Sequence, residues 1–180
     1  LLLAERFKRN EISQEQLPRD VVMTMCLADD IYKPDDATRI PYVWRQCCLF
    51  LAASIQTTSH TLPHVIVHLD EWLLEHPEDR QHLTDPQFLR KAATESLRLH
   101  QSSAVKFRVA AKDVVLSTGR RVAAGEQVAL FTTQANRAEA VFGEDAAYFN
   151  PYRKTPTAMM PWGLTFGSGR HMCFGSNLVI

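Results

Sequence analysis

The stretch that decides the fold lies near the end of the chain and reads Phe166-Gly167-Ser168-Gly169-Arg170-His171-Met172-Cys173-Phe174-Gly175. A single cysteine stands among glycines, directly before a predicted helix. Glycine adopts backbone conformations closed to other residues and lets a flat, bulky group approach the chain. Backbone N–H groups and a helix N-terminus near a cysteine favour the thiolate, which is a good ligand for soft metals. The pattern indicates a metal-binding thiolate; a structural cysteine and a redox-active thiol are the alternatives.

This string resembles the haem-binding loop of the cytochrome P450 family, Phe-x-x-Gly-x-(His/Arg)-x-Cys-x-Gly. It matches at every defined position, namely Phe166, Gly169, His171, Cys173 and Gly175. The resemblance implies that Cys173 is the axial metal ligand of haem b (iron protoporphyrin IX), and that its electron donation favours O–O cleavage. It also implies that His171 contacts a haem propionate and that Phe166 packs near the sulfur. Gly167 belongs to the same cofactor-binding loop.

A second motif, Glu95-Ser96-Leu97-Arg98, lies on a helix predicted from Asp85-Pro86 to His100. Glutamate and arginine three residues apart share a helix face and can pair, most simply as a solvated surface pair. Standing before the cysteine loop, the motif resembles the Glu-x-x-Arg of the family's K helix. Phe149-Asn150-Pro151-Tyr152-Arg153 resembles the segment that supplies a second arginine. The resemblance therefore implies a buried structural network of Glu95, Arg98 and Arg153.

Between these motifs lies a predicted group of short strands, from Val105 to Phe131, joined by glycine turns. Arg108 matches the strand arginine that binds a haem propionate in the family, and an exposed strand arginine without that role is an equal alternative. Ala135-Asn136-Arg137 resembles the family's Ala-Asn-Arg-Asp stretch, with Ala138 in place of the acid.

The third motif lies on a long apolar helix predicted from Pro41 to about Glu75. Ala53-Ser54-Ile55-Gln56-Thr57-Thr58 resembles the Ala-Gly-x-(Asp/Glu)-Thr-Thr of the family's I helix. The resemblance implies catalytic roles for the Thr57 hydroxyl and for Gln56 in a polar relay that delivers protons to dioxygen. Ser54 replaces the glycine and Gln56 replaces the acid. Glutamine forms hydrogen bonds but does not shuttle protons as a carboxylate does.

The register of this motif has two solutions. The interval from Thr57-Thr58 to His76-Pro77 is about one helical turn longer than is usual in the family, so a shift by one turn places His60-Thr61 at the relay. Thr57 and Thr61 lie on nearly the same helix face, and spacing alone barely separates them. The neighbouring residues favour Thr57.

The remaining segments predict a fold that is mainly α-helical with small β-sheets. Further helices are expected at 1–9 and 18–30, a polar loop at 33–38, helix then loop at 135–149, irregular coil at 150–169 and a helix from Cys173. Pro63 is expected to kink the long helix. The resemblance runs from Pro41 to Ile180, whereas a complete member of the family is more than twice as long. We therefore expect residues 1–180 to be the C-terminal part of a single P450 domain.

Composition limits the other possibilities. The 180 residues carry twenty basic and twenty acidic side chains, so no strong field attracts nucleic acid or an anionic membrane. Cys26, Cys47 and Cys48 form no C-x-x-C pair and predict buried small hydrophobes rather than a zinc site or a disulfide framework. A reducing, cytoplasmic location is expected. No apolar run is long enough to span a membrane, and an N-terminal membrane anchor is left open.

The predicted function is that of a haem-thiolate monooxygenase that inserts one oxygen atom from O2 into a small apolar organic substrate. The resemblance implies that electrons come from a ferredoxin, flavodoxin or reductase that docks near Arg170. Gln56 favours one alternative, an atypical or peroxide-using P450. A second alternative is a haem-free P450-like helper of a partner enzyme, although such helpers tend to lose the ligand cysteine and Cys173 is present.

Overall fold

The computed structural model describes residues 2–28 and 36–179. The chain divides into two compact units, Leu1–Gln56 and Thr57–Ile180. The long helix α3 (Asp36–Glu75) contributes its first part to one unit and its second part to the other. Among the helices of the described residues, none combines the length and the apolar character that crossing a membrane requires.

The first unit packs short helices around a small core. Its elements are α1 (Leu2–Lys8), the 3₁₀ turn η1 (Gln14–Gln16), α2 (Val21–Leu27) and the start of α3. The buried residues are Ala4, Leu17, Met23 and Cys26. The predicted second helix starts later than expected, at Val21, because the Asp20 side chain caps it by accepting a 2.7 Å hydrogen bond from the backbone of Met23. Asp29 and Asp30 lie outside the described residues.

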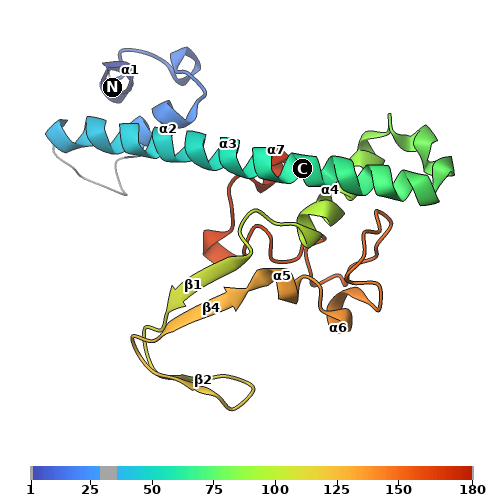
Figure 1. Ribbon diagram of the computed structural model, residues 1–180. Helices are drawn as coiled ribbons and strands as arrows, with labels where there is room; N and C mark the ends of the chain where they lie inside the picture. Colours follow the sequence, from blue (N-terminus) through green and yellow to red (C-terminus); the bar gives the residue numbers. More distant parts are fainter. Residues whose placement is uncertain (1, 29–35, 180) are drawn as a thin grey trace. The chain divides into compact units, whose positions relative to one another are not determined.

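Helix α3 confirms the predicted long helix and begins earlier than expected. Asp36–Thr38, predicted as loop, are helical. Residues 33–35 lie outside the described residues. Pro63 lies inside α3, which Figure 1 draws as one unbroken helix. The helix ends at Glu75, directly before His76-Pro77 as predicted.

The cysteines in this region differ from the prediction. Cys26 is buried in the first unit as expected, but Cys48 on α3 is exposed and Cys47 is only half-buried. The prediction of burial was therefore wrong for Cys48, because its face of α3 is turned to solvent. None of Cys26, Cys47, Cys48 and Cys173 forms a disulfide.

In the second unit, hydrogen bonds and a ring stack hold the end of α3 against neighbouring segments. After α3 the chain forms the 3₁₀ segment η2 (Pro77–His82). The indole Nε1 of Trp72 donates a 2.7 Å hydrogen bond to Asp79, and the hydroxyl of Tyr152 donates another of 2.7 Å to the same carboxylate. The ring of His76 stacks on Trp72 with centroids 3.9 Å apart. These contacts hold the turn after α3 against the distant segment around Tyr152.

Helix α4 (Pro86–Leu99) follows the prediction closely. The Asp85 side chain caps it by accepting from the backbone of Gln87 at 2.9 Å, and Pro86 occupies the first turn, where its missing N–H is not needed. The buried face carries Phe88, Ala92, Leu97 and Leu99. Three-and-four spacing of apolar residues thus sets which side of α4 enters the core.

Two small antiparallel sheets follow. Strand β1 (Val105–Val109) pairs with β4 (Gln127–Phe131), and β2 (Val114–Val115) pairs with β3 (Arg121–Val122) in the loop between them (Figure 1). The predicted strands are confirmed. The region predicted as helix then loop contains two single-turn helices, α5 (Thr132–Ala135) and α6 (Glu139–Phe142).

From Asn150 to Ser168 the described chain has neither helix nor strand, as predicted for this irregular segment. The 3₁₀ turn η3 (Gly169–His171) and helix α7 (Ser176–Val179) complete the second unit. The last helix was expected from Cys173 and begins at Ser176 instead. The expectation of a mainly α-helical chain with small β-sheets is confirmed.

Candidate functional site

The cysteine loop is a tight turn that presents its sulfur to solvent. Gly167 and Gly169 have φ angles of +75° and +71°, a left-handed backbone that strongly favours glycine. The backbone N–H of Cys173 donates to the carbonyl of Phe166 at 2.9 Å, and that of Met172 donates to Gly169 at 3.1 Å. These bonds close the loop and leave the Cys173 side chain exposed.

The surface beside the sulfur is apolar and open. Phe174 is 84 % exposed, and Met172 is exposed as well. A Cβ atom added to Gly175 would be in van der Waals contact with the Cys173 Sγ atom, at 3.5 Å. A soft sulfur donor on an open apolar surface suits a flat, largely apolar metal complex such as haem.

The segment leading into the loop is fixed to the rest of the second unit. The Lys106 ammonium on β1 donates to the carbonyls of Leu164 and Thr165 at 2.7 and 3.3 Å. Burial, and then the charge of Arg108, lowers the pKa of Lys106, while the nearby Cys173 acts in the opposite direction. The Thr165 hydroxyl donates to the carbonyl of Leu97 on α4 at 2.8 Å. The loop is therefore attached to both β1 and α4.

Asn136 adds a second attachment. Asn136 is only 1 % exposed. Its side-chain nitrogen donates to the Arg98 carbonyl at 3.1 Å, and its side-chain oxygen accepts from the backbone N–H of Leu164 at 2.7 Å. The chain at Gly163 approaches so closely that an added Cβ would lie 2.3 Å from the Asn136 Oδ1 atom. The motif around Asn136 was noted in the sequence, but this clamp was not predicted, since it joins residues far apart in the chain.

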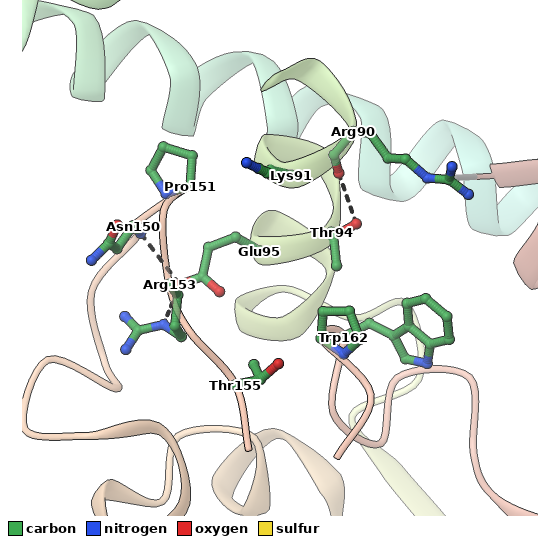
Figure 2. A pocket seen from close by; sticks show the side chains of 10 residues that line it. Arg90, Lys91, Thr94, Glu95, Asn150, Pro151, Arg153, Thr155 and Trp162 are labelled. Carbon is green, nitrogen blue, oxygen red and sulfur yellow. Dashed lines mark hydrogen bonds and ion pairs between the residues drawn. The ribbon is translucent and has the colours of Figure 1, made fainter. Parts of the chain in front are cut away.

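The Glu95, Arg98 and Arg153 network is present and buried. Arg98 is 0 % exposed and donates to the two Glu95 carboxylate oxygens at 2.8 and 2.7 Å. The Nε of Arg153 donates to Glu95 at 2.8 Å, and Figure 2 shows Glu95 reaching from α4 toward this second arginine. The predicted structural network is confirmed.

Both arginines also bind main-chain oxygens. Arg98 donates to the carbonyls of Asn136 and Ala146, the latter at 2.7 Å. Arg153 donates to the carbonyls of Phe142 at 2.6 Å and Tyr148 at 2.9 Å. The network thus binds backbone carbonyls at the ends of α5 and α6 and in the irregular segment that follows α6, where they have no partner within a helix or strand.

An open pocket of about 310 Å³ adjoins this network (Figure 2). Glu95 and Arg153 line it together with Lys91, Thr94 and Trp162. Because Glu95 and Arg153 are already paired, the pocket borders structural groups.

The two registers of the relay differ in burial. Gln56 and Thr57 are exposed on α3, whereas Thr61 is 7 % exposed. The Thr61 hydroxyl donates to the carbonyl of Thr57 at 3.0 Å, one turn earlier in the helix. A hydroxyl whose proton points to the backbone keeps its oxygen lone pairs free to accept a hydrogen bond.

Four histidine rings lie close together on α3 and at the end of α4, a feature that was not predicted from the sequence. His60, His64 and His68 follow one another every fourth residue on α3, and His100 stands at the end of α4. The ring centroids are 5.6 Å apart for His60 and His64, 4.5 Å for His64 and His100, and 4.8 Å for His68 and His100. We call these four residues the histidine column. Their spacing along one helix face was the signal available in the sequence.

The inner part of the column is kept neutral. Burial, then the charges of His100 and His64, lowers the pKa of His68 from 6.5 to about 4. Burial, His64 and then Arg137 lower the pKa of His100. His68 is also hydrogen-bonded through Nδ1 to the Ser96 hydroxyl at 2.9 Å.

The other predicted cofactor-binding residues lie on the surface. Arg108 is exposed on β1, and its guanidinium donates to the carbonyl of Phe107 at 2.8 Å. His171 is exposed within η3, and Phe166 is half-buried with its ring against Trp162, centroids 5.5 Å apart. Their roles toward a cofactor stay predictions.

Comparison with known proteins identifies one family. The family model described as Cytochrome P450 matches residues 3–179. Linalool 8-monooxygenase of Pseudomonas putida is 34% identical over 136 residues, which cover 72% of this chain and 30% of that protein. A biotin biosynthesis cytochrome P450 of Bacillus subtilis is 30% identical over 133 residues, covering 73% of this chain and 31% of that protein.

The solved structures agree. The crystal structure of P450BioI in complex with an acyl carrier protein that carries hexadec-9Z-enoic acid matches with a TM-score of 0.69 and 26% identity. It covers 99% of this chain and 41% of that protein chain. The ligand-free P450 monooxygenase TamI matches with a TM-score of 0.68 and 27% identity, over 99% of this chain and 40% of that one. The matched region spans 30% and 31% of the two curated relatives and 41% and 40% of the two solved protein chains.

Proposed function

Because the chain belongs to the cytochrome P450 family, we propose that it forms the C-terminal part of the single domain of a haem-thiolate monooxygenase. The proposed reaction inserts one oxygen atom from O2 into an apolar organic substrate. The observation that carries this proposal is the exposed Cys173 thiol on a loop that Lys106, Asn136 and Thr165 attach to β1 and α4.

In this proposal Cys173 is the iron ligand, and Arg108 and His171 pair with the haem propionates. Phe166 packs near the sulfur, while Gly167, Gly169 and Gly175 let the porphyrin approach the backbone. When bound, the haem supplies the activation of dioxygen. The protein supplies orientation: the attached loop holds the sulfur, and the Glu95 network holds the helix to which the loop is attached.

For the relay on α3 we propose Thr61 in preference to Thr57. Thr61 is buried, and its hydroxyl oxygen is oriented by the bond to the Thr57 carbonyl, whereas Gln56 and Thr57 are exposed. In this register His60 occupies the position of the family's acid. An imidazole can donate and accept a proton in a relay, which an amide such as that of Gln56 does not do.

The partners follow from the relatives. One relative is a linalool 8-monooxygenase, and one solved relative is bound to an acyl carrier protein that carries hexadec-9Z-enoic acid. We propose a small apolar organic substrate for this protein, and an electron-donor protein (a ferredoxin, flavodoxin or reductase) that docks near the exposed Arg170.

A peroxide-using P450 is the second candidate. The observation that favours it is the missing carboxylate: the acid position holds Gln56 in one register and His60 in the other. Oxidation of an apolar test substrate with hydrogen peroxide, in the absence of any electron donor, would support this candidate over the first.

The reduced carbon-monoxide difference spectrum of the complete protein tests the proposed function. We expect a band characteristic of thiolate ligation, lost in Cys173→Ala and kept in the matched control Cys48→Ala, whose thiol is exposed on α3. A spectrum unchanged in Cys173→Ala would overturn the assignment. Complete protein without bound haem would instead support a haem-free helper.

A further inference from the structure

We propose that Trp72, Asp79 and Tyr152 form a redox relay, in which an oxidising equivalent that reaches Trp72 passes to Tyr152 while Asp79 exchanges protons between them. We call these three residues the redox triad. The inference goes beyond the proposed function and requires no haem, because the three side chains, which all lie in the second unit, carry out the whole transfer.

The triad is built around one carboxylate that binds two oxidisable side chains. The indole Nε1 of Trp72 donates to one Asp79 oxygen at 2.7 Å, and the Tyr152 hydroxyl donates to the other at 2.7 Å. The centroids of the indole and phenol rings are 6.3 Å apart. Both protons that leave on oxidation therefore point at the same acceptor, and the two rings are close enough for an electron to move directly between them.

Asp79 is suited to accept either proton. The residue is 7 % exposed, and burial by itself raises the pKa of its carboxyl group. The hydrogen bonds from Trp72 and Tyr152 lower that pKa, as do His82 and His76 nearby, and the net pKa lies below the ordinary value of 3.8. The group is therefore an anion at neutral pH. Burial, and then the bond to Asp79, raises the pKa of Tyr152 to about 12, so the phenol keeps its proton until it is oxidised.

Neighbouring contacts fix the three side chains. The ring of His76 stacks on Trp72 with centroids 3.9 Å apart, and the His76 carbonyl accepts from the backbone N–H of Asp79 at 3.1 Å. The backbone N–H of Tyr152 donates to the Asn150 side chain at 2.9 Å. Donors and acceptor are thus held in place before the reaction, and the proton transfers need no rearrangement of the chain.

The triad leads from a partly buried residue to the surface. Trp72 is half-buried and Asp79 is buried, whereas Tyr152 is 47 % exposed. A radical on Tyr152 is accessible to reductants in solution, such as thiols or ascorbate, which return one electron and one proton and restore the phenol. The relay would in this way remove an oxidising equivalent from the indole at the end of α3.

The transfer balances in electrons and protons. A one-electron oxidant takes an electron from the Trp72 indole, and the Nε1 proton moves to the Asp79 oxygen that it already contacts. An electron then passes from Tyr152 to the indolyl radical, the phenolic proton moves to the second Asp79 oxygen, and the first proton returns to Nε1. The products are a tyrosyl radical, an intact indole and an unchanged carboxylate. Near neutral pH an indolyl radical oxidises a phenol, which sets the direction of the transfer.

Pulse radiolysis of the complete protein in bromide solution tests the relay. The dibromide radical anion oxidises tryptophan much faster than tyrosine, and it is itself reduced to bromide. We expect the tyrosyl-radical absorbance to grow as the indolyl-radical absorbance decays, in a first-order phase whose rate is independent of protein concentration. Tyr152→Phe should lose this phase. The control Tyr148→Phe, which changes an exposed tyrosine of the same segment, should keep it.

Asp79→Asn and heavy water test the role of the carboxylate. Asparagine has a similar shape but is a poor proton acceptor, so we expect the transfer to become at least about tenfold slower. Heavy water should also slow the transfer in the unmodified protein, a measurement that needs no variant to fold. A rate in heavy water equal to that in ordinary water would overturn the proton exchange. A tyrosyl-radical phase in Tyr152→Phe identical to that of the unmodified protein would overturn the relay.

Discussion

His68 carries its imidazole into the interior of the second unit, and only 8 % of the residue is exposed. Since its pKa falls from 6.5 to about 4 on folding, the unfolded chain binds a proton more readily than the folded protein between these values. The stabilisation from neutral His68 is complete above about pH 6.5 and is lost progressively as the pH falls toward about 4.

We therefore expect the free energy of unfolding to fall by about 1–2 kcal/mol between about pH 7 and pH 5 because of this residue, after allowance for solvent screening. His68→Gln keeps a polar group near Ser96 and should lose that part of the pH dependence. Urea denaturation of both proteins at the two pH values measures it. An equal change in the free energy of unfolding between the two pH values in the unmodified protein and in His68→Gln would contradict the prediction.

Gly163 provides a second prediction for a single residue. Its φ of +59° and the 2.3 Å approach of an added Cβ to Asn136 combine backbone strain with a steric clash. Gly119 has a comparable φ of +82° but open space around it. We expect Gly119→Ala to cost about 1 kcal/mol of stability from strain alone, and Gly163→Ala about 2 kcal/mol more. Equal losses of stability in the two variants would show that the Asn136 side chain moves aside without destabilising the protein.

Between elements, the Glu95 carboxylate joins α4 to the coil that carries Arg153. Glu95→Gln would leave the buried Arg98 guanidinium without its anion and Arg153 with Asp145 as its remaining carboxylate, and we expect a loss of about 3–5 kcal/mol of stability. The control Arg120→Gln removes one member of an exposed 3.8 Å pair with Glu126 and should change stability by less than about 0.5 kcal/mol. Chemical denaturation measures both, and a loss below about 1 kcal/mol in Glu95→Gln would contradict a buried network.

The sequence predicts elements well where the signal is local. Asp85-Pro86 and the apolar spacing after it predict α4, and alternating Val105, Phe107 and Val109 predict β1. The start of α2 was missed because it depends on which of several residues caps the helix, and Asp20 does so. Local sequence patterns thus predict whether a segment forms a helix or a strand, and roughly how long it is, better than they predict its first and last residues.

The candidate site also contains parts that the local sequence predicts and parts that it does not. The string around Cys173 and the Glu95 and Arg98 spacing are contained in short stretches, so they were predictable. The hydrogen bond from Lys106 to Leu164 and the close contact of Asn136 with Gly163 join segments far apart in the chain. No local sequence pattern predicts such contacts. Thr61 is buried and Thr57 is exposed, and spacing along a helix does not contain this information.

At the scale of the whole molecule, the chain spans about a third of the length of its curated relatives and exposes large apolar side chains. Trp44, Ile66 and Phe174 are 69 %, 60 % and 84 % exposed. Apolar surface of this extent marks contacts with other protein or with a ligand. It is what we expect of part of a larger P450 domain.

We accordingly expect the 180-residue chain by itself to bind the dye 8-anilinonaphthalene-1-sulfonate and to self-associate, and the complete protein to do neither. Dye fluorescence and light scattering at matched concentrations measure the difference. A monodisperse 180-residue chain that does not enhance the dye's emission would show that these side chains are covered in some other way.

The stacking of His76 on Trp72 at the end of α3 also makes this indole an optical reporter. A protonated imidazole in van der Waals contact quenches indole emission, whereas a neutral one quenches it far less. The 3.9 Å stack therefore couples the brightness of Trp72 to the protonation of His76. With Trp44 and Trp162 replaced by phenylalanine, the remaining emission would follow the end of this helix through acidification or unfolding without any attached label.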